Sequence, residues 1–192
     1  MKHSLRRWRR HDTAGYAIEL VTTAAANGLA GAVAAALADS PEARLPAALR
    51  ATGNGTFVAF AAPFALQAAR SERRGWWTYV GAHVIHAACL VTMARRHRLH
   101  GGTFSGASRY GGALGYATIA ALGATSYKPA GTPSERTALR RQHRLGEQFL
   151  FGLYGFTITH GYVAKGKNRV VYGPLGALWL IAAARGRARW DP

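Results

Sequence analysis

The chain has 192 residues, a formal net charge of +17 and one cysteine, Cys89. A single cysteine excludes a disulfide framework and a cysteine-based zinc or iron–sulfur site within one chain. The positive charge lies at the ends of long apolar stretches and does not spread over one face, so we expect no nucleic-acid partner. The sequence also lacks the GxGxxG and GxxxxGK[ST] fingerprints, so the chain offers no obvious flavin, nicotinamide or ATP site of its own.

The apolar stretches predict an all-α integral membrane bundle of six transmembrane helices with both termini in the cytoplasm. A basic cytoplasmic arm, 1–12, precedes the six-helix transmembrane domain, 13–184, and a basic cytoplasmic tail covers 185–192. The expected spans are, in chain order, 13–37, 52–69, 75–94, 110–127, 145–164 and 170–184.

The orientation follows from the distribution of Lys and Arg. With six spans, the two termini and the second and fourth loops share one side of the membrane. That side carries sixteen of the twenty-five basic residues, and the other three loops carry nine. The positive-inside rule places the more basic side in the cytoplasm.

The first span carries one acidic residue, Glu19. An ionised, unpaired carboxylate at membrane depth is costly, so we expect Glu19 to be protonated, paired with a basic group or close to an aqueous path. It is a candidate for a proton or quinone site.

The third span is the most informative stretch of the chain. Residues 75–94 contain no formal charge, counting histidine as neutral, and would form a helix of about 30 Å, one hydrocarbon thickness. Trp76 and Trp77 stand at its start, where indole rings favour the membrane interface. His83 and His86 lie inside it, and their spacing of three residues places both on one face. Imidazoles at this depth are candidates for a functional site.

The fifth span supplies one more histidine at membrane depth, His160. The third and fifth spans run in the same direction, and His86 and His160 lie about 17 Å and about 22 Å from their starts. Two imidazoles at similar depth can ligate a haem iron from both sides. The alternative is that they hydrogen-bond to carbonyl groups or to each other as structural contacts. The remaining histidines lie in basic flanks and are expected to be solvated: His3, His11, His97, His100 and His143.

Five segments together resemble the ferric reductase-like transmembrane domain family. Within it the chain is most similar to the small haem-binding membrane subunits that serve a bacterial periplasmic methionine sulfoxide reductase, and more distantly to NADPH oxidases and STEAP metalloreductases. The matching segments are TGNGTFVAFAAPFALQAAR, RRGWWTYVGAHVIHAACL, YGGALGYATIAALGATS, LRRQHRLGEQFLFGLYGFTITHGYV and VYGPLGALWLIAAARGR.

The resemblance implies a haem b held by the imidazoles at positions 86 and 160. His83 would then be a hydrogen-bonded neighbour, a partner of the haem propionates or an alternative ligand. Two-haem members of the family carry a further histidine about 13 residues before the distal one, where this chain has Glu147. A carboxylate replaces that ligand poorly, so one haem is expected. Glu147 becomes a candidate for a proton or quinone site, the alternative being a charge pair with Arg141 or Arg144.

The resemblance therefore implies a b-type haem transmembrane electron-transfer subunit of the bacterial inner (cytoplasmic) membrane, and an oxidoreductase component if haem is bound. Its expected partners are the lipid bilayer, a separate electron donor (a quinol or a flavoprotein) and an acceptor protein at the outer face. Two alternatives remain open: a non-haem structural or assembly subunit of a membrane complex, and a cofactor-free membrane enzyme acting on a lipid.

Overall fold

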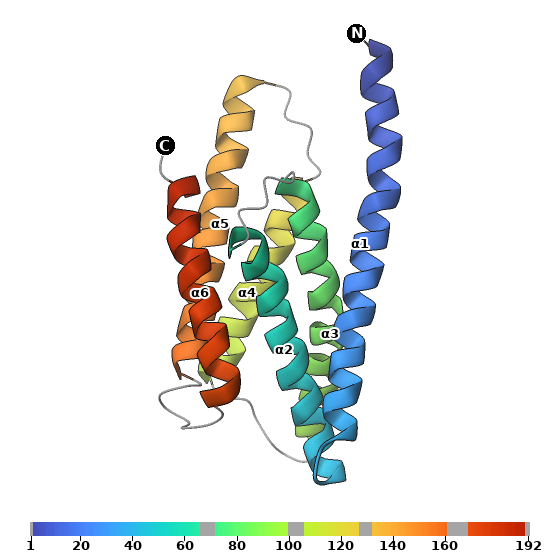
Figure 1. The fold of residues 1–192 in the computed structure, drawn as a ribbon, viewed down its shortest axis with the longest axis vertical. Coiled ribbons are helices and arrows are strands. Elements are labelled where there is room, and N and C mark those ends of the chain that lie inside the picture. The colour runs from blue at the N-terminus through green and yellow to red at the C-terminus, as the bar shows by residue number, and fades with distance from the viewer. Residues whose placement is uncertain (1, 66–71, 100–105, 127–131, 161–168, 191–192) are drawn as a thin grey trace. The chain divides into compact units, whose positions relative to one another are not determined.

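The computed structural model describes residues 2–65, 72–99, 106–126, 132–160 and 169–190. These ranges form six α-helices and contain no strand, which confirms the all-α class (Figure 1). The helices are α1 (Lys2–Ala36), α2 (Pro41–Ala65), α3 (Glu72–Leu99), α4 (Gly106–Ser126), α5 (Pro133–Thr159) and α6 (Arg169–Trp190). They divide into two compact units, which are described separately below.

The first unit contains α1, α3 and α2 as far as Phe60. Helices α1 and α3 run in parallel, because Leu20 lies against Gly81 and Gly28 lies against Ile85. At Gly81 a β-carbon would collide with the backbone carbonyl of Leu20, so only glycine permits this approach. Small residues that allow close backbone contact are typical of helix packing in membranes.

Helix α2 runs antiparallel to α3 within the same unit. Thr52 lies beside His86, and about two turns further along α2 Phe60 packs on Tyr79 with ring centroids 5.1 Å apart. The helix begins with a proline at its first position, Pro41, where no backbone N–H is needed. The Ser40 hydroxyl accepts a hydrogen bond from the backbone N–H of Ala43 at 3.3 Å and so caps the first turn.

The second unit contains α4, α5, α6 and the last residues of α2. Glycines again mark the contacts: Gly146 of α5 meets Leu122 of α4, and Gly155 of α5 meets the indole of Trp179 of α6. The Trp179 Nε1–H donates to the Phe151 carbonyl at 3.0 Å. The end of α2 joins this unit, where Arg185 donates a hydrogen bond to the carbonyl oxygen of Ala65.

Several helices extend beyond the stretches that the sequence predicted. Helix α5 begins at Pro133, within the expected polar connector 128–144, and helix α2 includes most of the expected connector 38–50. At α5 the cause is a capping box: Thr132 and Glu135 each bond the other's backbone N–H through their side chains. Local capping therefore starts this helix about three turns before its apolar stretch begins.

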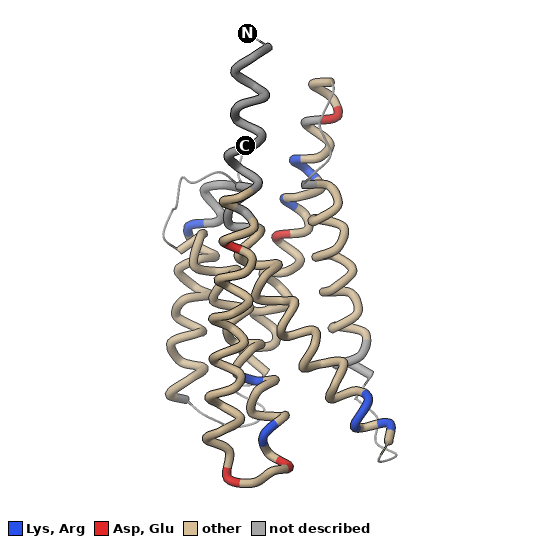
Figure 2. The backbone as a smooth tube through the Cα atoms, turned by 90° about the vertical axis from the view of Figure 1, so that its right-hand side faces the viewer, with Lys and Arg blue, Asp and Glu red and all other residues tan. Residues whose placement is uncertain are grey.

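Two helical segments are long and apolar enough to cross a membrane, Ala17–Ala36 of α1 and Trp77–Leu99 of α3. A shorter apolar segment, Val170–Arg185, lies in α6. The middle turns of these helices carry few charged residues (Figure 2). Only 11% of the α1 span window and 22% of the α3 span window are buried, whereas the core helix of a water-soluble domain is mostly buried.

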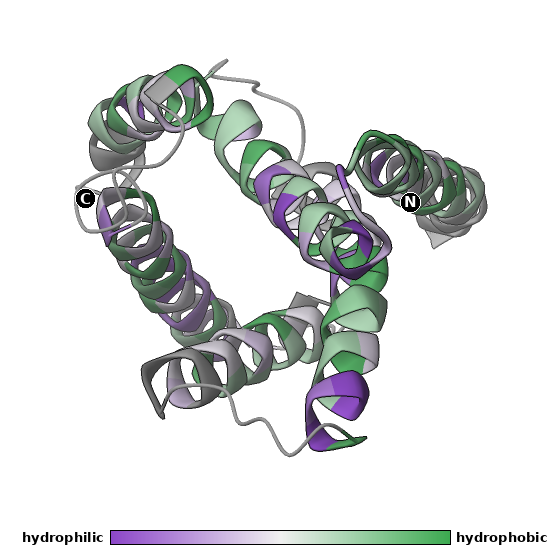
Figure 3. Cartoon of the chain, turned by 90° about the horizontal axis from the view of Figure 1, so that it is seen from below, coloured by the Kyte–Doolittle hydropathy of each residue, from purple (hydrophilic) through white to green (hydrophobic). Residues whose placement is uncertain are grey.

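The first unit buries polar residues beside the apolar core residues Phe57, Phe60 and Tyr79. Its buried residues include Asn27, Thr52, Thr56 and His83, while large aliphatic side chains of the same helices are exposed. Figure 3 shows hydrophobic residues along the length of the described helices. The exposed aliphatic residues of α1 and α3 include Ile18, Val21, Leu29, Val33, Val84 and Val91.

Candidate functional site

The first unit contains five polar residues that are buried or half-buried, here called the three-helix polar cluster: Asn27, Thr52, Thr56, His83 and His86. Helix α1 contributes Asn27, α2 contributes the two threonines, and α3 contributes the two histidines. Four of the five are buried and His86 is half-buried. Buried polar groups are costly unless they are hydrogen-bonded, so the partners of each side chain decide what the cluster can do.

His86 is held by a hydroxyl from the neighbouring helix. Its Nδ1 lies 3.1 Å from the Thr52 Oγ1. The Thr52 hydroxyl has one hydrogen, which it directs to the Ala48 carbonyl at 2.9 Å, so its oxygen accepts from the imidazole. From this hydrogen-bond pattern we assign the proton of His86 to Nδ1 and the lone pair to Nε2. A metal-ligating histidine typically has this form, with one ring N–H donated to a fixed acceptor.

His83 has the same tautomer for a similar reason. Its Nδ1 lies 3.0 Å from the carbonyl oxygen of Tyr79, which can only accept, so His83 donates. Its ring also packs on the Tyr79 ring with centroids 4.1 Å apart. The rings of His83 and His86 lie 6.4 Å apart at 88° to each other. The structure thus brings together the two histidines that the sequence placed on one helix face.

Asn27 joins all three helices at the level of the histidines. Its Nδ2 donates to the Ala82 carbonyl of α3 at 2.7 Å and to the Thr52 carbonyl of α2 at 3.2 Å. The Asn27 Oδ1 is buried and has no hydrogen-bond partner. A β-carbon on Gly55 would overlap this oxygen, so the glycine makes room for the amide. Asn27 was visible in the sequence as an amide inside the first apolar span, but no role was predicted for it.

Gly53 determines how closely α2 approaches the His86 ring. A β-carbon at Gly53 would lie 3.1 Å from the His86 Cε1, tighter than most real contacts. The carbon Cε1 stands between the two ring nitrogens, so this glycine and Thr52 together limit the orientations of the imidazole.

His160 belongs to the second unit, at the C-terminal end of α5. Its side chain is exposed, and its ring stacks on Phe156 with centroids 5.8 Å apart and planes 9° apart. The backbone N–H of His160 donates to the carbonyl groups of Phe156 and Thr157. The two predicted axial ligands, His86 and His160, therefore come from different units of the chain.

A second threonine–histidine pair occurs in the second unit, and the sequence reading missed it. His143 was expected to be solvated, yet it is half-buried on α5 with its Nε2 3.0 Å from the Thr125 Oγ1 of α4. The Thr125 hydroxyl donates to the Ala121 carbonyl at 2.9 Å, so it accepts from His143. Because α5 begins at Pro133, His143 lies on a helix face that packs against α4. In the predicted polar connector it would not have been on a helix.

The two acidic candidates lie in different units. Glu19 is half-buried on α1, and its Oε2 is buried without a hydrogen-bond partner. Glu147 is half-buried on α5, one turn beyond His143. Both remain candidates for proton or quinone chemistry.

Within the described ranges, no three His, Cys, Asp or Glu side chains lie close enough together to hold a metal ion. Haem binding needs only two axial imidazoles. Comparison of the chain with protein-family models, with curated proteins and with solved structures finds no match to any of them.

Proposed function

We propose that the chain is a b-type haem electron-transfer subunit of the bacterial inner membrane, built as a six-helix transmembrane bundle with both termini in the cytoplasm. The observation that carries the proposal is the His86–Thr52 contact. It keeps an imidazole in an apolar span, with Nδ1–H donated and the Nε2 lone pair available. This matches the chemistry of an axial haem ligand.

The membrane part of the proposal is supported by the polar residues that the first unit buries and the aliphatic residues that it exposes. Asn27 and His83 are buried, while Ile18 and Leu29 are 63% and 66% exposed. In water this arrangement would cost free energy at every exposed aliphatic side chain, whereas in lipid those side chains lie in a matching solvent. The two candidate spans of α1 and α3 belong to this unit.

In the proposed complex His86 and His160 would be the residues that hold the haem. The haem, when bound, supplies reversible one-electron transfer between ferric and ferrous iron. Thr52 orients His86, and Asn27 holds α1, α2 and α3 together at that level. Glu19 and Glu147 are proposed to handle protons or to contact a quinone. Because the chain lacks nucleotide fingerprints, a quinol or a flavoprotein would be the donor and a protein at the outer face the acceptor.

The visible spectrum of the purified full-length chain tests this function. Expression with added haem precursor should give a sharp Soret band, and dithionite should produce the paired visible bands of a reduced b-type haem. His86→Ala and His160→Ala should each remove most of the bound haem. His97→Ala is the matched control, because His97 lies on the same helix as His86, three turns further on.

Two results would overturn the proposal. One is a folded, membrane-inserted chain that carries no haem under these conditions. The other is an unchanged spectrum in both His86→Ala and His160→Ala. Co-purification of a haem-free chain with stoichiometric partners would instead favour a structural subunit.

A further inference from the structure

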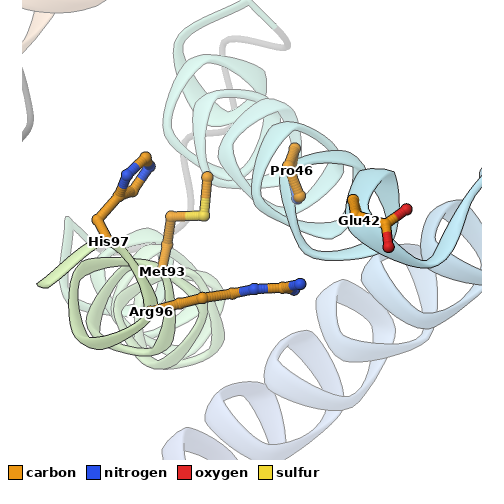
Figure 4. Close-up of a pocket in the computed structure, with 5 residues that line it drawn as sticks. All are labelled: Glu42, Pro46, Met93, Arg96 and His97. Atoms are coloured by element: carbon orange, nitrogen blue, oxygen red, sulfur yellow. The ribbon is translucent and has the colours of Figure 1, made fainter. Parts of the chain in front are cut away.

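A pocket of about 210 Å³ lies in the first unit, between the first turns of α2 and the last turns of α3. Figure 4 shows the five residues that line it, with Arg96 extending from α3 toward α2. They are Glu42, Pro46, Met93, Arg96 and His97. The proposed haem function does not use any of them.

The pocket presents one negative and one permanent positive group. Hydrogen bonds from the Glu42 backbone N–H and from Ser40, together with the charge of Arg96, hold the pKa of the Glu42 carboxyl below its ordinary value of 4.5. Glu42 is therefore ionised at neutral pH. An exposed pair of opposite charges adds little to the stability of the fold. A ligand that carries both charges can therefore bind Glu42 and Arg96 without a large loss of stability.

The lining also includes the apolar residues Pro46 and Met93 and the imidazole of His97, and the position of the pocket suits a membrane surface. Arg96 stands about 5 Å before the end of the candidate span Trp77–Leu99. A span that crosses the bilayer ends at the level of the lipid headgroups. The pocket volume is below the range of about 300–1,000 Å³ that holds a drug-sized molecule, so a headgroup fits and acyl chains do not.

We propose that this pocket binds the phosphoethanolamine headgroup of a membrane lipid, with the phosphate on Arg96 and the ammonium on Glu42. A guanidinium forms strong charge-assisted bonds to phosphate, and a carboxylate does the same with an ammonium. The acyl chains would lie outside the pocket, along the exposed aliphatic side chains of the first unit. This inference rests on the membrane location proposed above and is independent of haem binding.

The chain offers its own reporter for the test. It contains two methionines, and Met93 lines the pocket, so methyl-¹³C-methionine labelling gives one signal at the site. The full-length chain in detergent micelles is titrated with dihexanoyl phosphatidylethanolamine, with dihexanoyl phosphatidylglycerol and with soluble O-phosphoethanolamine. We expect the ethanolamine lipid to shift the Met93 signal saturably and the glycerol lipid to bind at least about fivefold more weakly, because it lacks the ammonium.

Variants assign the two contacts. Glu42→Gln and Arg96→Gln should each weaken binding of the ethanolamine lipid by about tenfold. Arg44→Gln and Arg98→Gln are the matched controls, because these exposed arginines lie on the same two helices outside the pocket lining, and they should change binding by less than about twofold.

Four results would overturn the proposal, and the first three are no saturable shift of the Met93 signal, equal binding of the two lipids, and equal effects of pocket and control variants. O-phosphoethanolamine binding as tightly as the lipid would reassign the pocket to a soluble ligand and also overturn it. The comparison of the two lipids uses the unmodified chain, so it stands even if a pocket variant fails to fold.

Discussion

The Nδ1 atom of His86 lies 3.1 Å from the Thr52 hydroxyl oxygen, which joins α3 to α2 in the interior of the first unit. Thr52 is fully buried, and its own hydrogen is directed to the Ala48 carbonyl. The imidazole is consequently the donor in this contact. One hydroxyl thus decides which ring nitrogen of His86 carries the lone pair.

Replacing Thr52 tests that assignment directly. In Thr52→Val the hydroxyl is lost while the shape is kept, so His86 Nδ1 loses its acceptor and the imidazole should populate both tautomers. Nitrogen-15 chemical shifts of His86 in the haem-free chain should show this mixture, whereas Thr52→Ser should retain the single tautomer. Haem affinity should fall by about 10- to 100-fold in the valine variant. A single unchanged tautomer in Thr52→Val would contradict the assignment.

The glycine at position 81 should be essential for the contact between α1 and α3. In Gly81→Ala the new methyl group meets the Leu20 backbone carbonyl, which cannot move without displacing its helix. We expect a loss of about 1–3 kcal/mol in the free energy of unfolding, measured as a lower Tm in detergent.

Gly112→Ala is the control for that substitution. No atom lies within 4 Å of a β-carbon at Gly112, so this helical glycine should tolerate alanine and gain up to about 1 kcal/mol from helix propensity. Equal effects at the two positions would show that close packing at Gly81 has no special role.

Removal of the Asn27 amide should lower the thermal stability of the first unit. In Asn27→Ala both donated hydrogen bonds to α2 and α3 disappear, and hydrogen bonds between membrane helices contribute about 0.6–1.7 kcal/mol. Thermal unfolding of Asn54→Ala provides a comparison, because Asn54 lies half-buried on α2 in the same unit. If the two variants unfold at the same temperature, the claim that Asn27 stabilises the contact between α1, α2 and α3 is wrong.

Glu42 should titrate below the ordinary range. A lowered pKa in the folded chain means that the carboxylate contributes stability above its ordinary value of 4.5 and loses that contribution as the pH falls through the lowered pKa. A carbon-13 titration of the Glu42 carboxyl should give this pKa. Ser40→Ala should raise it, and Arg96→Gln should raise it less, because the charge of Arg96 is the smaller cause. If Arg96→Gln raised the pKa of Glu42 more than Ser40→Ala did, this order of the two causes would be wrong.

Much of the architecture was predictable from local pattern. Six apolar stretches predicted six helices, and the charge-free stretch around His83 and His86 lies inside α3 as expected. The helix ends were less predictable, because they are determined by capping residues and not by hydropathy. Thr132 and Glu135 cap the start of α5 inside a stretch that was predicted to be a polar connector. Because the helix starts there, His143 lies on α5 in contact with Thr125.

The sequence by itself determined the all-α class, the apolar character of α1 and α3, and the placement of His83 and His86 on one face, since each depends on residues within a few turns of one another. Only the tertiary structure decided that Thr52, 34 residues away, holds His86, and that Asn27, 55 residues from Ala82, clamps three helices. Such pairings depend on where glycines let two backbones approach. Sequence periodicity gives the face of a helix but does not identify the residue that meets it.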